Sequence, residues 1–345
     1  MNRTDKLREL LDDNEGVILT GYPNIFYYTG FTSEDAVVFI TKNRQILVTD
    51  SRYSVQARQE AKEFEIHDIT DGIDKIVGFL DADTLGFEEG VVTVKELARY
   101  QKFGKKLIPM QDKISGLRRV KDEFEIEKIK KAEELGDSAY SYVLENIHAG
   151  MTEREVALML EFYMRKNGAS GTSFDTIVAS GLRSSMPHGT ATDKVIGIGD
   201  FVTMDFGCRL DGYCSDMTRT VVIGKCSDRQ REVYEVVLSA QKAAIEAVEI
   251  GKKCSEIDKV ARDIITDAGY GKNFGHSLGH SVGIEIHERP VFAPKSDEVV
   301  ETGNVITVEP GIYIEGWGGV RIEDVVAVGE NVHNLTKSCK DLTII

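Results

Sequence analysis

The chain has 345 residues, a formal net charge of −15 and 41% hydrophobic residues, which is enough for two domains with a sizeable core. The acidic excess argues against nucleic acid as a partner, because phosphate binding requires clustered Lys and Arg. No apolar run reaches the roughly 18 residues of a membrane span, and no basic-then-apolar segment indicates a signal peptide. The five cysteines show no disulfide-like spacing, so we expect a cytoplasmic protein with no membrane partner.

Residues 1–115 are expected to form a separate N-terminal α/β domain. Apolar, β-branched runs predict strands at 17–20, 36–40 and 45–49, and helical spacing predicts helices at 4–12, 53–63, 73–80 and 93–103. Phe26, Tyr27, Tyr28 and Phe31 form an aromatic cluster that is more typical of a domain core than of an active-site mouth.

Residues 116–345 are expected to form the second domain, which contains an internal repeat. After a link at 111–121, apolar spacing predicts a long helix at 123–145. Segments 150–155 and 251–256 each open a further helix, and each helix is followed by strands. A duplicated helix–helix–strands unit predicts two pseudo-symmetric halves that share a sheet, with four helices packed on its outer face.

Residues 203–223 read as a β-hairpin whose turn is Asp211-Gly212. In that register Asp205 faces Thr218, and Asp216 lies on the same face as Asp205. Two carboxylates this close repel each other unless a cation lies between them, which indicates a metal site. Two solvated aspartates on an edge hairpin are the alternative.

Further metal-ligand types follow downstream. His276, His280 and His287 lie in glycine-rich or loop-like segments, Glu309 ends a predicted strand, and Glu323 lies inside an apolar strand. A buried carboxylate is costly unless it is paired. An oxygen-rich set with one nitrogen suits a pair of divalent ions, with Mn²⁺, Co²⁺, Zn²⁺ or Fe²⁺ as candidates.

These ordered segments resemble the pita-bread metallopeptidases, the family of methionine aminopeptidase, Xaa-Pro aminopeptidase and Xaa-Pro dipeptidase. Segments 24–31 and 50–53 also resemble the N-terminal domain of creatinase and prolidase. The resemblance implies an α/β (α+β) fold, with a creatinase-like N-terminal domain and a pseudo-two-fold pita-bread domain. It implies a site with two divalent metal ions, Mn²⁺ foremost, and assigns the ligands as Asp205, Asp216, His280, Glu309 and Glu323.

The resemblance also implies roles for neighbouring residues. His188 and His287 would contact the scissile carbonyl and stabilise the tetrahedral intermediate, and Glu309 would also transfer protons. His276 would line the pocket, although a buried, hydrogen-bonded histidine is an equal alternative. Arg321 would orient the carboxylates or bind a substrate end.

The N-terminal domain favours the proline-specific branch, because methionine aminopeptidases lack it. We therefore expect metal-dependent hydrolysis of the Xaa-Pro bond in short peptides with proline at the second position. Segment 50–53 with Gln56-Ala57 favours an Xaa-Pro aminopeptidase over the alternative, an Xaa-Pro dipeptidase (prolidase). The complete ligand set argues against creatinase, which lacks it, and against a non-catalytic peptide- or histone-binding protein. The resemblance also implies a homodimer.

Overall fold

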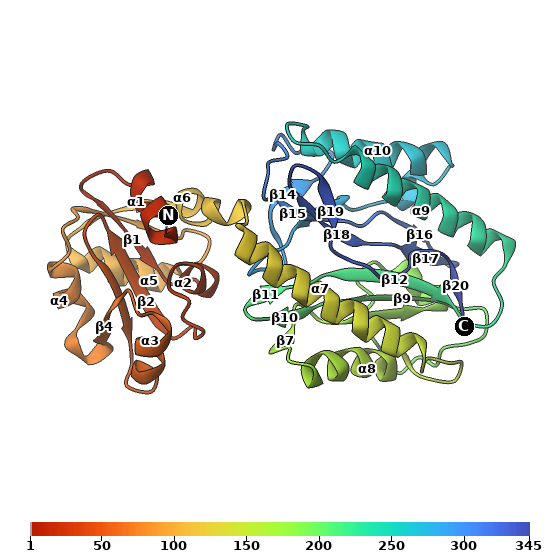
Figure 1. The fold of residues 1–345 in the computed structure, drawn as a ribbon, viewed down its shortest axis with the longest axis horizontal. Helices are drawn as coiled ribbons and strands as arrows, with labels where there is room; N and C mark the ends of the chain where they lie inside the picture. Colours follow the sequence, from red (N-terminus) through yellow and green to blue (C-terminus); the bar gives the residue numbers. More distant parts are fainter. Residues whose placement is uncertain (1) are drawn as a thin grey trace. The chain divides into compact units, whose positions relative to one another are not determined.

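The computed structural model describes residues 2–345, which form two compact units. The first unit runs to Arg118 and the second spans Arg119–Ile345 (Figure 1). This division falls three residues beyond the boundary predicted at 115/116. Within residues 2–345, no helix is both long enough and apolar enough to cross a membrane.

The first unit is built on a six-stranded sheet in the order β4-β3-β2-β1-β5-β6. Strands β1, β2 and β3 pair antiparallel, and the other pairs are parallel. The strands are β1 Glu15–Leu19, β2 Ala36–Thr41, β3 Gln45–Thr49, β4 Glu65–Asp68, β5 Thr84–Phe87 and β6 Lys106–Pro109. The helices are α1 Arg3–Leu10, α2 Tyr22–Thr29, α3 Ser54–Glu60, α4 Ile73–Gly78, α5 Val94–Tyr100 and α6 Gln111–Gly116.

The predicted strands and helices of this unit are present, but the sequence patterns missed others. Edge strands β4 and β6 are short and carry exposed polar residues, so they lack a clear alternation. Helix α2 was missed because it is apolar on nearly all sides, which is typical of a buried helix. Phe26, Tyr27, Tyr28 and Phe31 are buried, so the core interpretation of this cluster is confirmed.

The second unit contains two helix pairs, two larger sheets and two smaller ones. The helices are α7 Glu123–Leu144, α8 Glu153–Lys166, α9 Asp228–Ala247 and α10 Cys254–Asp267. The four-stranded sheet has the order β20-β12-β9-β8, formed by β20 Thr343–Ile344, β12 Met217–Val222, β9 Phe201–Phe206 and β8 Ile177–Ser180. The five-stranded sheet has the order β14-β13-β15-β18-β19, formed by β14 Glu288–Phe292, β13 Gly279–Ser281, β15 Val305–Val308, β18 Asp324–Val328 and β19 Val332–Asn334. The smaller sheets contain β7 Gly171–Thr172, β10 Cys208–Leu210 and β11 Tyr213–Cys214, and the pair β16 Gly311–Ile314 and β17 Gly318–Arg321.

The two predicted halves are present. One core joins α7 and α8 to β8, β9 and β12, and the other joins α9 and α10 to β15 and β18. Figure 1 shows α9 and α10 along the top of this unit, α8 along its bottom, and α7 running diagonally across it toward α8. The prediction of one shared sheet is wrong in detail, because the halves form separately hydrogen-bonded sheets. They meet where the Glu323 N–H donates to the Thr218 carbonyl over 3.1 Å.

The predicted hairpin register is confirmed. Leu210 pairs with Tyr213, and Asp205 pairs with Thr218. Asp211 and Gly212 both have positive φ, 49° and 84°, as the tight turn between twisted strands requires.

Gly207 allows the two arms of this hairpin to approach, and replacing it should destabilise the protein. A Cβ at this position would lie 1.9 Å from the Ser215 carbonyl oxygen, so the backbone must move. We expect Gly207→Ala to cost about 1–3 kcal/mol or more, measured as a lower midpoint of thermal unfolding. Gly136→Ala is the control, because a Cβ there lies 3.9 Å from Ser215 Oγ in a helix that favours alanine. Equal midpoints for the two variants would contradict this account.

Candidate metal centre

The central hairpin supplies the first two acidic side chains. Asp205 lies in β9 and Asp216 immediately precedes β12, and both are buried. The register places them toward the same side of the hairpin, where β12 faces the second half of the unit.

The second half supplies the remaining predicted ligands. His280 lies in β13, Glu309 follows β15, and Glu323 immediately precedes β18. The Nε2 atom of His280 lies 3.6 Å from Asp216 Oδ2 and 3.4 Å from Glu309 Oε1. Ligand atoms of Asp216, His280 and Glu323 all lie within 4.8 Å of one another, as a shared metal ion requires. Side chains from both halves therefore converge on one site.

The burial of this set changes the protonation of its members. Burial, followed by the charge of Glu323, raises the pKa of Asp216 well above its usual range. Burial and the charge of Glu309 do the same to the pKa of Glu323. Burial also raises the pKa of Glu309 to about 8 and lowers the pKa of His280 to about 4. The raised pKa values mean that too little positive charge lies near these carboxyl groups to keep all of them ionised. The histidine is held neutral, which is the form that binds metal.

The donor set fits divalent ions. Asp205 Oδ1 is buried and accepts no hydrogen bond from any residue in 2–345, so one lone-pair site of this ligand candidate remains open. Within the same residues, Arg321 is the one lysine or arginine that forms an ion pair with any of the four carboxyl groups, and its partner is Asp205. Oxygen-rich sites with one imidazole suit Mn²⁺, Co²⁺, Zn²⁺ or Fe²⁺.

Arg321 joins the ligand set to the segment before His188. Its Nη2 donates to Asp205 Oδ2 over 2.6 Å, and its Nε donates to Thr218 Oγ1 over 3.0 Å. Its Nη1 donates to the Tyr313 hydroxyl over 2.6 Å and to the Pro187 carbonyl over 3.2 Å. Arg321 is almost fully buried by these contacts. This geometry favours orientation of carboxylates over binding of a substrate end.

The three further histidines differ in their surroundings. The His287 ring lies 4.5 Å from the His280 ring, and the His287 side chain is exposed beside the ligand set. His188 is exposed in the loop after the 3₁₀ helix Gly181–Ser185 and contributes to the electrostatic environment of His276. His276 has partners at both ring nitrogens, the Ser277 carbonyl at 2.8 Å and the Tyr313 hydroxyl at 3.0 Å. The alternative of a buried, hydrogen-bonded histidine therefore describes the contacts of His276 better.

A buried glutamate holds both ends of the loop that carries His188. Glu153 Oε1 accepts hydrogen bonds from Ser180 N and Oγ, and its Oε2 accepts from Thr192 N and Oγ1. Arg183 Nε also binds this carboxylate, at 3.0 Å. The loop is thereby fixed on both sides of His188, which suits a residue that must meet a substrate in one position.

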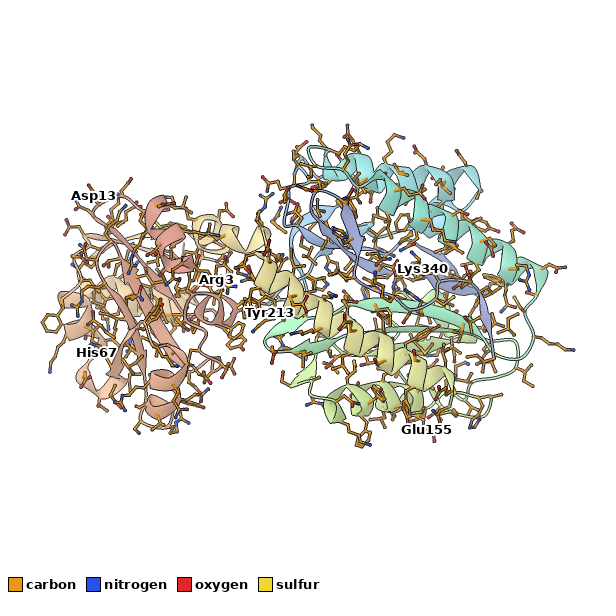
Figure 2. The ribbon with its side chains drawn as sticks, viewed as in Figure 1. Arg3, Asp13, His67, Glu155, Tyr213 and Lys340 are labelled. Carbon is orange, nitrogen blue, oxygen red and sulfur yellow. The ribbon has the colours of Figure 1, made fainter. Side chains whose placement is uncertain are left out.

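Asp324 is adjacent to Glu323 in sequence, but its side chain lies among different partners. Its carboxylate binds Arg219 at 2.7 Å, Lys340 at 2.6 Å and Gln241 at 2.9 Å (Lys340 is labelled in Figure 2). Burial opposes its ionisation, but the Arg219 and Lys340 charges outweigh burial and hold the pKa of Asp324 below its usual range. Asp324 therefore points away from the ligand set, as strand alternation predicts.

Sequence reasoning missed the hydroxyl groups that orient the ligand candidates. Thr218 Oγ1 donates to Glu323 Oε2 over 2.6 Å. Thr307 Oγ1 donates to Glu309 over 3.2 Å and accepts the His280 N–H over 3.0 Å. Both threonines lie in apolar strands, and a hydroxyl at a buried position is a signal that such a role exists. Tyr313 was missed as well, because one of its two partners, His276, lies 37 residues away in the sequence.

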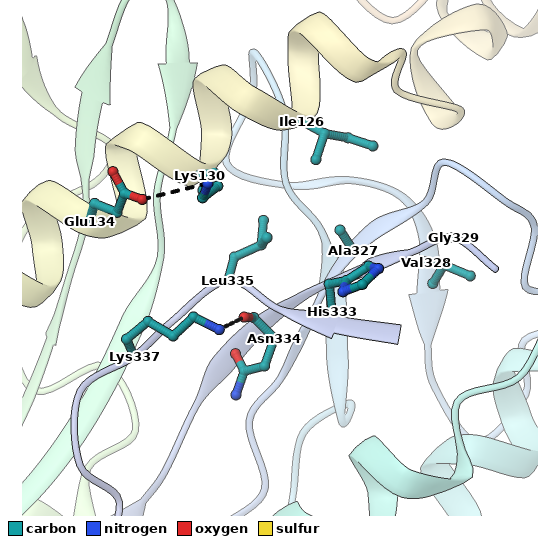
Figure 3. Close-up of a pocket in the computed structure, with 10 residues that line it drawn as sticks. All are labelled: Ile126, Lys130, Glu134, Ala327, Val328, Gly329, His333, Asn334, Leu335 and Lys337. Carbon is teal, nitrogen blue, oxygen red and sulfur yellow. Dashed lines mark hydrogen bonds and ion pairs between the residues drawn. The ribbon is translucent and has the colours of Figure 1, made fainter. Parts of the chain in front are cut away.

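A separate cavity of about 370 Å³ lies between α7 and the strands β18 and β19 (Figure 3). Its lining consists of Ile126, Lys130, Glu134, Ala327, Val328, Gly329, His333, Asn334, Leu335 and Lys337. None of the predicted site residues is among them, so the cavity is distinct from the candidate metal centre.

Comparison with known proteins shows matches over both units. Residues 127–330 match metallopeptidase family M24, and residues 3–120 match the creatinase/prolidase N-terminal domain. An Xaa-Pro dipeptidase of Pyrococcus furiosus is 41% identical over 355 residues, with 99% of each chain covered. The structure of an Xaa-Pro dipeptidase from Bacillus anthracis has a TM-score of 0.96 and 44% identity, with 99% of each chain covered. The structure of an X-Pro aminopeptidase from Thermotoga maritima has a TM-score of 0.93 and 40% identity, with 100% of each chain covered.

Metal-free protein should lose stability as the pH rises from 6.5 to 8. The carboxyl group of Glu309 has a folded pKa of about 8, against an ordinary value of 4.5. The folded state therefore holds this proton more tightly than the unfolded chain, and this advantage disappears as the pH approaches 8. The pKa values of His276 and His280 are lowered from 6.5 to about 4, so the titration of these histidines lowers the stability of the protein only as the pH falls below 6.5.

The measurement is the thermal midpoint of metal-stripped protein at several pH values between 6.5 and 8. Glu309→Gln should give a shallower decline, because its side chain no longer titrates, whereas the exposed Glu134→Gln should decline like the parent. A midpoint that stays level or rises with pH in the parent protein would contradict the assignment.

Proposed function

This chain belongs to metallopeptidase family M24, and from that premise we propose that it hydrolyses Xaa-Pro dipeptides with the help of two divalent metal ions. The observation that carries the proposal is the convergence of Asp216, His280 and Glu323 within 4.8 Å, with Glu309 beside His280. The open Oδ1 of Asp205 adds a fifth ligand candidate to the set.

The proposed ligands are Asp205, Asp216, His280, Glu309 and Glu323. The chemistry that bound divalent ions supply is a hydroxide nucleophile near neutral pH and polarisation of the scissile carbonyl. Mn²⁺ is the ion we propose first, because carboxylate-rich sites suit it.

The chain's own residues would position the substrate and move the proton. Glu309 lies 3.4 Å from His280, and its carboxylate would accept a proton from the nucleophile and return it to the departing proline nitrogen. His287 is exposed beside His280, and His188 is exposed and acts electrostatically on His276. We propose that both histidines donate hydrogen bonds to the carbonyl oxygen as it gains negative charge. Proline needs such a dedicated site, because its nitrogen in a peptide carries no hydrogen to donate.

The dipeptidase is proposed in place of the aminopeptidase that segment 50–53 favours. The Pyrococcus furiosus and Bacillus anthracis relatives are both described as Xaa-Pro dipeptidases, and both are similar over nearly the whole chain. Within the first unit, Asp50 accepts the backbone N–H of Arg52 at 2.8 Å and pairs with its guanidinium at 2.6 Å. These local contacts shape the turn before α3. The motif therefore has a structural role that does not depend on the length of the peptide substrate.

The aminopeptidase remains a second candidate because of one finding. The Thermotoga maritima structure described as an X-Pro aminopeptidase has a TM-score of 0.93 to this chain. Homodimerisation and a cytoplasmic location stay predictions.

Hydrolysis of Ala-Pro and Ala-Pro-Ala distinguishes the candidates. Metal-stripped protein would be assayed after addition of Mn²⁺, Co²⁺ or Zn²⁺, and we expect cleavage of Ala-Pro in preference to the tripeptide. Asp216→Asn should abolish cleavage, because it removes a charged ligand. Asp211→Asn is the matched control in the same hairpin, because asparagine also tolerates the positive φ of that turn. Cleavage of the tripeptide alone would establish the aminopeptidase instead. If neither peptide is hydrolysed, the proline-peptidase proposal is refuted.

Replacing the two exposed histidines should affect catalysis more than metal binding. We expect His188→Ala and His287→Ala each to lower kcat by about 10²-fold or more, the range found for lost oxyanion donors. The affinity for Mn²⁺, measured by calorimetry, should stay at the parent value. His333→Ala is the control, because His333 lies on β19 beside the separate cavity. A parallel loss of Mn²⁺ affinity would instead make these histidines part of the metal site.

A further inference from the structure

Helix α7 buries Glu133 on the side that packs into the core. The buried residues of α7 are Glu125, Ile129, Ala132, Glu133, Gly136, Ala139, Tyr140 and Val143. Glu133 is 1% exposed, and it forms no ion pair with any lysine or arginine within residues 2–345. A carboxyl group in such a place is costly unless hydrogen bonds satisfy it, so its partners indicate why a glutamate stands there.

Both oxygens of Glu133 accept hydrogen bonds from groups behind the ligand set. Oε1 accepts the backbone N–H of Asp216 over 2.8 Å. Oε2 accepts the hydroxyl of Thr336 over 3.0 Å. The same Thr336 oxygen accepts the backbone N–H of Val325 over 3.0 Å, and Val325 is two residues beyond Glu323. A continuous chain of hydrogen bonds thus joins the backbone at Asp216 to the strand that begins after Glu323.

The next turn of α7 fixes the same C-terminal segment. Asp137 accepts the backbone N–H groups of Lys337 and Ser338, at 2.8 Å and 2.7 Å, and the Ser338 hydroxyl at 2.6 Å. Thr336 is therefore held in place from two successive turns of one helix. This buried network links Asp216 to the start of β18, in addition to the direct hydrogen bond from the Glu323 N–H to the Thr218 carbonyl, and it crosses from one half of the unit to the other.

We propose that Glu133 is a positioning residue for the metal ions, holding Asp216 and Glu323 at the separation that a shared pair of ions requires. The inference rests on the proposed function in taking these two carboxylates as metal ligands. Glu133 itself touches neither the ions nor the substrate. A carboxylate suits this role because it offers an acceptor to each side, whereas an amide offers only one.

The test is calorimetric titration of the metal-stripped full chain with Mn²⁺ alone. Glu133→Gln keeps the size of the side chain but turns one of its two acceptors into a donor. The hydrogen bond from either the Asp216 N–H or the Thr336 hydroxyl must then rearrange, so Mn²⁺ affinity should fall about 10-fold or more. Thr336→Val should weaken Mn²⁺ binding in the same direction, and the double variant should lose less than the product of the two single losses. Glu134→Gln is the matched control, because it makes the same change at the neighbouring exposed position. Hydrolysis of Ala-Pro by Glu133→Gln should recover at saturating Mn²⁺.

The proposal is overturned if Glu133→Gln and Thr336→Val bind Mn²⁺ as the parent does while unfolding at a lower temperature, which marks a purely structural role. Should Glu133→Gln fail to fold, Thr336→Val decides alone. Because the titration needs no substrate, its outcome is independent of hydrolysis. The expected affinities together with inactivity on Ala-Pro and Ala-Pro-Ala would support this inference and reject the proposed function, whereas a parent chain that binds no Mn²⁺ would reject both.

Discussion

The second unit depends on one electrostatic constraint, the burial of four carboxyl groups around a single point. Asp205, Asp216, Glu309 and Glu323 come from both halves, and within residues 2–345 Arg321 is the one guanidinium that forms an ion pair with any of them, through Asp205. Without further positive charge such a set cannot be fully ionised, which is why burial raises the pKa values of three of its members. Divalent ions would supply the missing positive charge. The cluster of carboxyl groups that destabilises the metal-free fold is therefore the cluster that would bind the ions.

The surrounding scaffold meets this constraint by supplying a side-chain hydrogen-bond donor to Asp205, Glu309 and Glu323. Thr218 and Thr307 provide hydroxyls, and Arg321 provides a guanidinium. Contacts of this kind fix the orientation of a ligand before any ion binds, which reduces the cost of assembling the site. The same logic extends outward to α7, where Glu133 binds the backbone of Asp216.

Glu323 and Asp324 show how strand geometry separates two adjacent acids. Glu323 faces the other carboxyl groups, and its pKa is raised, whereas Asp324 faces Arg219 and Lys340, and its pKa is lowered. The two residues differ by one position in a chain whose side chains alternate sides. One face therefore becomes a candidate metal centre, and the other becomes a buried ion-pair network that anchors the C-terminal segment.

The sequence alone predicted the hairpin register and the duplicated helices, because turn residues and helical spacing are local signals. The five ligand candidates came from the resemblance to a known family, and they stay predictions. The sequence did not determine edge strands β4 and β6, the division into two sheets, or the partners of Thr218, Thr307 and Tyr313. It also left the roles of His276 and Arg321 open. Those features depend on residues far apart in the chain, and only tertiary packing decides which buried donor meets which buried acceptor.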